Sequence, residues 1–85
     1  MSKAVALPIS RAAKWLPKRD KRWFLVAFQG PAGLYAIQSL PDARYQVHRL
    51  MREDPPRPVA MSEPFMTPEG ARQFAMKLAE GVESQ

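Results

Sequence analysis

The fold of this chain is decided by the stretch Trp23-Phe24-Leu25-Val26-Ala27-Phe28. Aromatic and β-branched side chains favour extended backbone, so these residues predict a β-strand. Gly30-Pro31-Ala32-Gly33 follows and has the composition of a turn. Leu34 to Leu40 is again apolar and predicts a second strand. The two strands and the turn between them therefore predict an antiparallel hairpin.

Two more extended segments follow the hairpin. Residues 44–51 alternate between two faces and predict a third strand. One face holds Tyr45, Val47, Arg49 and Met51, and the other holds Arg44, Gln46, His48 and Leu50. Residues 52–58 contain three prolines and predict an irregular loop. Residues 59–61 predict a short fourth strand at the sheet edge.

A helix is predicted near the end of the chain. Thr67 is a suitable N-cap, and Pro68 suits the first helical position. Apolar residues then recur at spacings of three and four and form one stripe: Ala71, Phe74, Ala75, Leu78 and Ala79. Gly81 suits the residue that ends a helix. The pattern predicts a helix from about Pro68 to Glu80.

These elements predict an α+β fold, an antiparallel meander of three to four strands packed on one face by the C-terminal helix. Residues 1–22 are expected to form a basic N-terminal arm, in which Ser10 caps a short helix over Arg11 to Leu16. Residues 23–85 are expected to form the domain. The side chains expected under the helix are Phe24, Val26, Phe28, Tyr35, Ile37 and Val47.

The other face of the sheet also needs a cover. Trp23, Leu25 and Ala27 alternate with the predicted core residues of the first strand, so this strand is apolar on both faces. Three covers fit the sequence. The N-terminal segment can fold back over the sheet, a second copy of the chain can pair with it, or a partner can bind there.

Positive charge is concentrated at the start of the chain. The formal net charge of the 85 residues is +5. Residues 1–22 hold seven basic side chains and one acidic side chain, a net charge of +6, whereas residues 23–85 hold six basic and seven acidic side chains, a net charge of −1. A basic arm ahead of a near-neutral domain is a pattern that attracts polyanions.

The arm supplies the candidate nucleic-acid-binding residues. Lysine and arginine neutralise phosphates, and tryptophan can stack on an exposed base. The candidates in the arm are Arg11, Lys14, Trp15, Lys18, Arg19, Lys21 and Arg22. The alternative interpretation is a solubilising tail with Trp15 packed into the core.

The composition argues against catalysis. The chain has no cysteine, so disulfides and thiolate metal sites are excluded. It has one histidine, His48, too few for a histidine-based metal site. No pattern pairs a nucleophile with a base. We therefore expect no enzymatic activity, no catalytic residues, no metal and no cofactor. The lack of a signal-peptide pattern or a long apolar segment predicts a cytoplasmic location without membrane contact.

The order of elements resembles a known family. A strand that opens Trp23-Phe24-x-Val26 is followed by further strands and by Phe65-x-Thr67-x-Glu69-x-Ala71-x-x-Phe74-Ala75 at the start of the helix. This layout is similar to the small three-stranded-sheet-plus-helix arm DNA-binding domains of tyrosine integrases. That family reads the DNA major groove through its sheet. The resemblance adds Arg44 and Arg49, in the predicted third strand, to the candidate site.

Two functional hypotheses follow. The first is a small non-enzymatic accessory or regulatory protein that binds nucleic acid, DNA in preference to RNA, through its basic arm. The second is a protein-interaction module, such as a small inhibitor or adaptor, that docks on the acidic surface of a partner protein. A homodimer is compatible with both hypotheses.

Overall fold

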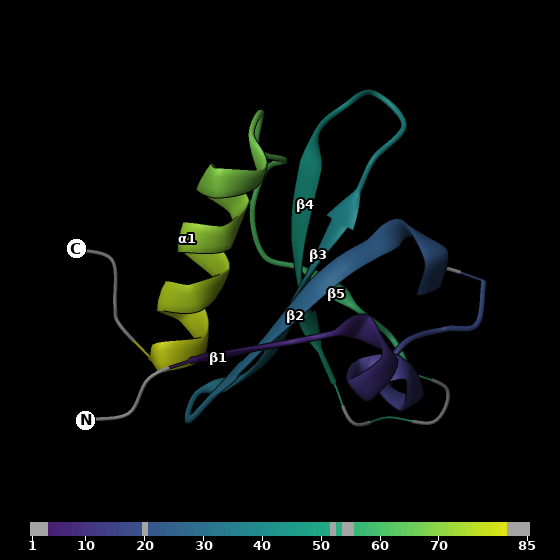
Figure 1. The fold of residues 1–85 in the computed structure, drawn as a ribbon, viewed down its shortest axis with the longest axis vertical. Helices are drawn as coiled ribbons and strands as arrows, with labels where there is room; N and C mark the ends of the chain where they lie inside the picture. The colour runs from purple at the N-terminus through teal and green to yellow at the C-terminus, as the bar shows by residue number, and fades with distance from the viewer. Residues whose placement is uncertain (1–3, 20, 52, 54–55, 82–85) are drawn as a thin grey trace.

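The computed structural model describes residues 4–19, 21–51, 53 and 56–81 of the chain. It has an α+β fold in which a five-stranded antiparallel sheet is packed against a C-terminal helix (Figure 1). The strands are β1 (Val5–Leu7), β2 (Phe24–Gly30), β3 (Gly33–Ser39), β4 (Tyr45–Leu50) and β5 (Val59–Ala60). They lie in the sheet in the order of the sequence, so the predicted α+β meander is confirmed.

The central hairpins follow from the apolar runs. Ile37 of β3 lies opposite Val26 of β2 and opposite Val47 of β4, so these apolar side chains share one face of the sheet. Ile37 and Val47 are fully buried. A short two-residue β5 lies beside β4, with Val59 opposite Arg49, where a fourth strand is predicted.

The sheet has one strand more than the sequence predicts. β1 pairs antiparallel with β2 and places Val5 opposite Gln29 and Leu7 opposite Ala27. The expectation of three to four strands is therefore too low. A three-residue strand depends on a neighbour for its hydrogen bonds, so residues 5–7 carry little strand signal of their own.

The helix α1 (Pro68–Glu80) has the predicted bounds. The hydroxyl of Thr67 accepts a hydrogen bond from the backbone N–H of Gly70 at 3.1 Å. Gly81 ends the helix with a φ of 85°, in the left-handed region that glycine adopts without strain. Ala71, Ala75 and Ala79 are fully buried, so α1 meets the sheet through its smallest side chains.

The core between α1 and the sheet is named here the α1-side core. It consists of Phe28, Tyr35, Ile37, Val47, Ala71, Ala75 and Ala79, with Val26 packed against it. The prediction that Phe24 belongs to this face is wrong, because Phe24 is buried on the opposite face. The pairing of β2 with β3 shifts register between Phe24 and Val26, and this bulge reverses the inward and outward alternation.

The opposite face is covered by the N-terminal segment of the same chain. A 3-10 helix η1 (Ile9–Trp15) lies across the sheet from α1 (Figure 1). Its side chains complete the second core, named here the η1-side core, which consists of Ala12, Leu16, Phe24, Ala27, Leu34, Ala36 and Leu50. Of the three covers that the sequence allows, the structure has the intramolecular one.

The helical segment differs in detail from its prediction. It spans Ile9–Trp15 rather than Arg11 to Leu16, and Pro8 occupies the cap position without any side-chain hydrogen bond. The prediction that Ser10 is the cap is therefore wrong. A second 3-10 turn, η2 (Lys21–Trp23), leads directly into β2. Within the described residues, no helix has the length and apolar character needed to span a membrane.

Candidate nucleic-acid interface

The N-terminal segment holds a row of exposed cations against the sheet. Ala12 and Leu16 of this segment are buried in the η1-side core, at 1% and 3% exposure. The side chains that do not pack on the sheet point to solvent. These exposed cations are Arg11, Lys14, Lys18 and Arg19, which we call the basic ridge.

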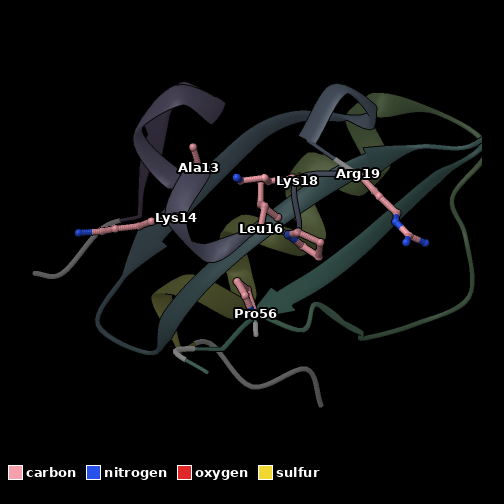
Figure 2. A pocket seen from close by; sticks show the side chains of 7 residues that line it. Ala13, Lys14, Leu16, Lys18, Arg19 and Pro56 are labelled. Atoms are coloured by element: carbon pink, nitrogen blue, oxygen red, sulfur yellow. The ribbon is translucent and has the colours of Figure 1, made fainter. Parts of the chain in front are cut away.

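A depression of about 490 Å³ lies within the basic ridge. Three of its lining residues are the cations Lys14, Lys18 and Arg19, and the other four are Ala13, Leu16, Pro17 and Pro56. Figure 2 shows Lys14 and Arg19 extending away in opposite directions, with Lys18 between them. The hollow therefore combines an apolar floor with a positively charged rim.

A smaller hollow adjoins this one through a shared residue. It has a volume of about 120 Å³ and is lined by Lys14, Trp15, Met51 and Glu53. Trp15 is half-buried and packs against the η1-side core. Part of its ring thus serves packing, as the alternative interpretation of the arm expects, and part remains accessible beside Lys14.

Arg22 and Trp23 form a second cation and aromatic pair. The guanidinium carbon of Arg22 lies 5.1 Å from the centre of the Trp23 ring, which is cation–π geometry. Trp23 is 41% exposed, and Leu25 nearby in the chain is 52% exposed. This pair lies where η2 meets β2, and it presents a flat aromatic surface to solvent. The side chain of Lys21, another predicted site residue, lies outside the described set.

Arg44 lies apart from the basic ridge, in the turn between β3 and β4. Its Nε donates a hydrogen bond to Oδ2 of Asp42 at 2.7 Å. This hydrogen bond holds the pKa of the Asp42 carboxyl below its usual value, and the carboxylate raises the pKa of Arg44. The charge of Arg44 is therefore largely balanced within its own turn.

Arg49 also lies away from the ridge. It stands opposite Tyr35 in the sheet, on the α1 face, and its guanidinium carbon is 6.0 Å from the Tyr35 ring centre. It lines a hollow of about 330 Å³ at the β2–β3 turn, which Trp15 borders as well. The structure thus places Lys14, Lys18 and Arg19 around one hollow, with Arg11 exposed earlier in the same segment, and leaves Arg44 and Arg49 outside this group.

Sequence reasoning missed the floor of the depression. Pro56 comes from the loop after β4, distant in sequence from Ala13 and Pro17, and no sequence signal links them. The buried residues of the N-terminal segment did carry a signal, because Ala12 and Leu16 are apolar and four residues apart, which is the spacing of one face in the α-helix that the sequence predicts there. That spacing predicts which side of the segment faces the sheet.

His48 is the single histidine of the chain, and it packs within the sheet. Nε2 of His48 lies 2.8 Å from Oε1 of Gln38, and the ring meets Phe24 edge-on at 5.4 Å between centroids. These contacts place His48 in the packing between β3, β4 and the η1-side core. The part of the chain that the structure describes contains no group of three or more side chains suited to holding a metal ion.

Comparisons of the chain with protein-family models, with curated proteins and with solved structures give no match. The resemblance to the arm domains of tyrosine integrases therefore stays a prediction.

Proposed function

We propose that the protein is a small non-enzymatic nucleic-acid-binding protein of the cytoplasm, with an accessory or regulatory role. The basic ridge is its contact surface. The observation that carries the proposal is the set of three exposed cations, Lys14, Lys18 and Arg19, around one hollow with an apolar floor. Cations at such a rim can each neutralise a phosphate of the same strand.

The start of the ridge is anchored to the sheet. Ala12 and Leu16 are buried against β2, β3 and β4, so the backbone that carries Arg11 and Lys14 packs on the sheet. A preorganised surface loses less conformational entropy on binding than a flexible tail does. This favours the ridge over a purely solubilising role for the arm.

The cations of the basic ridge form no ion pair with a carboxylate of any described residue. Among the described residues, the ion pair that forms joins Arg44 to Asp42, away from the ridge. Glu53 lines the smaller hollow together with Lys14, so its carboxylate lies at the Lys14 end of the ridge. The surface around Lys18 and Arg19 is thus suited to a polyanion.

Fluorescence anisotropy with labelled DNA and RNA oligonucleotides at low salt tests the proposal. The double variant Lys18→Gln/Arg19→Gln removes two ridge cations, and we expect it to bind about tenfold more weakly or worse. Arg72→Gln/Lys77→Gln is the matched control, because it removes one arginine and one lysine from the exposed side of α1. Equal losses of affinity in both variants would show that binding depends only on net charge and not on the ridge. No binding by the wild type would refute the proposal.

A second candidate function is docking on an acidic protein partner. β1 pairs with β2 from Ala27 to Gln29, whereas Phe24 and Val26 pair with β3 on their other side. Beside this part of β2, the exposed Leu25 and Trp23 offer apolar surface next to Arg22. An extended acidic segment, or a second copy of the chain, can add at such an edge.

Light scattering and affinity capture distinguish these two occupants. A dimer that Leu25→Asp converts to a monomer supports self-association through this edge. A monomer at every concentration excludes the homodimer. Docking on a partner is supported if the wild type captures one acidic protein from nuclease-treated lysate. Leu25→Asp should lose this capture, and Lys18→Gln/Arg19→Gln should keep it.

A further inference from the structure

We infer that the depression in the basic ridge receives an unpaired base, so that the protein binds single-stranded nucleic acid in preference to duplex. The inference rests on the proposed function and specifies the ligand of the same surface. It is carried by the contrast between the floor of the depression and its rim.

The floor is apolar and belongs to two separate parts of the chain. Ala13, Leu16 and Pro17 come from the N-terminal segment, and Pro56 comes from the loop after β4. The volume of about 490 Å³ lies within the range of roughly 300–1,000 Å³ that small-molecule sites occupy. A base, whose faces are apolar, can fill such a hollow and remove its floor from water.

The rim is charged at the positions where the backbone of a strand would pass. Lys14 and Arg19 extend away from the hollow in opposite directions, and Lys18 lies between them (Figure 2). A base seated on the floor leaves its own phosphate and the neighbouring phosphates at this rim. The arrangement therefore matches one nucleotide with phosphates on either side of it.

A duplex cannot use the floor in this way. Its base faces are stacked inside the helix, and a protein meets phosphates and groove edges instead. The cations would still attract a duplex. The apolar floor formed by Ala13, Pro17 and Pro56 would stay uncovered, because no base of the duplex can reach it. The apolar floor therefore favours a strand whose bases are exposed.

An exposed aromatic side chain, Trp23, follows the lining residue Arg19 along the chain. Trp23 is 41% exposed and is four residues after Arg19, a span of at most about 14 Å of extended chain. Arg22 stacks on one side of it at 5.1 Å. A neighbouring base of the same strand can stack on this ring, which makes tryptophan fluorescence a second readout of binding.

Three DNA probes of about 15 nucleotides, a length near the upper site size of small single-strand binders, separate the contributions of base and phosphate. They are labelled oligothymidylate, an abasic strand of the same length, and a duplex. We expect oligothymidylate to bind about tenfold more tightly than the abasic strand, since a base that covers the apolar floor removes apolar area from water. We also expect it to bind more tightly than the duplex.

A variant that fills the hollow tests its location. Ala13→Gln adds bulk without charge, and we expect it to bring the affinity for oligothymidylate close to the affinity for the abasic strand, which itself stays unchanged. Ala6→Gln is the matched control, because Ala6 is an exposed alanine opposite Phe28 on the α1 face. Pro56→Gln is the second variant if Ala13→Gln fails to fold by circular dichroism.

The outcomes separate this inference from the proposed function. Equal affinity for oligothymidylate and the abasic strand overturns the base site and leaves nucleic-acid binding standing. The base site is overturned in the same way if both floor variants fold and retain the full preference for oligothymidylate. No binding of any of the three probes overturns the proposed function together with the inference.

Discussion

Phe24 and Val26 lie on opposite faces of the sheet, although they are two residues apart in one strand. Phe24 is buried in the η1-side core, and Val26 packs against the α1-side core. Side chains two residues apart share a face in a regular strand, and the register shift between Phe24 and Val26 breaks this rule. The bulge turns Leu25, the residue between them, out to solvent and supplies an apolar side chain to each core.

The bulge predicts that two adjacent residues contribute very differently to the free energy of unfolding. Phe24→Ala should reduce the free energy of unfolding by about 3–5 kcal/mol, because it empties a buried aromatic site. Leu25→Ala should change it by less than about 0.5 kcal/mol, because Leu25 is 52% exposed. Urea denaturation followed by circular dichroism measures both. A loss for Leu25→Ala as large as the loss for Phe24→Ala would contradict the bulge, because a regular strand would bury both side chains.

The end of α1 lies so close to the β2–β3 turn that Gly30 should not tolerate a larger residue. A Cβ atom added there would lie 2.7 Å from the carbonyl carbon of Ala79, and the Ala79 oxygen also accepts a hydrogen bond from the N–H of Ala32 at 3.0 Å. Gly30→Ala should therefore displace the end of α1 and destabilise the fold by about 1–3 kcal/mol.

Gly70→Ala provides the control for this substitution. A Cβ at Gly70 meets the side chains of Phe65 and Thr67 at 3.3 Å, and alanine is the better helix former. Its effect on the free energy of unfolding should stay within about 1 kcal/mol. Equal and small effects at the two glycines would contradict the packing of α1 against the turn.

The turn between β3 and β4 predicts a pH dependence. The hydrogen bond from Arg44 lowers the pKa of Asp42 below its ordinary value of 3.8. A pKa lowered by folding contributes stability above the unfolded pKa, and this contribution is lost as the pH falls through the folded pKa. Both side chains are exposed, so we expect the effect in the titration rather than in the melting temperature.

Carboxyl-carbon NMR titration checks this prediction directly. In the wild type, the pKa of Asp42 should lie below 3.8, and Arg44→Gln should raise it toward that value. Arg72→Gln, on α1, should leave it unchanged. An Asp42 pKa that does not respond to Arg44→Gln would show that the two side chains are not paired in solution.

Local signals account for the parts of the fold that the sequence predicts. The bounds of α1 follow from the Thr67 cap, Pro68 and the Gly81 stop, because these residues act on backbone groups only a few positions away. The hairpin of β2 and β3 likewise follows from two apolar runs around one turn. Such features need no knowledge of the rest of the chain.

The missed features depend on contacts between distant residues. β1 exists because Val5 and Leu7 pair with β2, some twenty residues further along the chain. The bulge at Leu25 is set by the register with β3, and the floor of the depression needs Pro56 beside Ala13. Of the candidate site, the cations of the arm could be chosen from charge alone, whereas their grouping without Arg44 and Arg49 required the fold.

The salt dependence of binding tests the central claim most directly. Affinity for oligothymidylate should be measured over a range of salt concentrations for the wild type and for Lys18→Gln/Arg19→Gln. If the basic ridge contacts phosphates, the logarithm of the association constant falls linearly with the logarithm of salt concentration. The slope of the variant should be smaller in magnitude by about 1.4, or about 0.7 for each lost phosphate contact. A wild-type slope near zero, or identical slopes for both proteins, would contradict the ridge as a nucleic-acid interface.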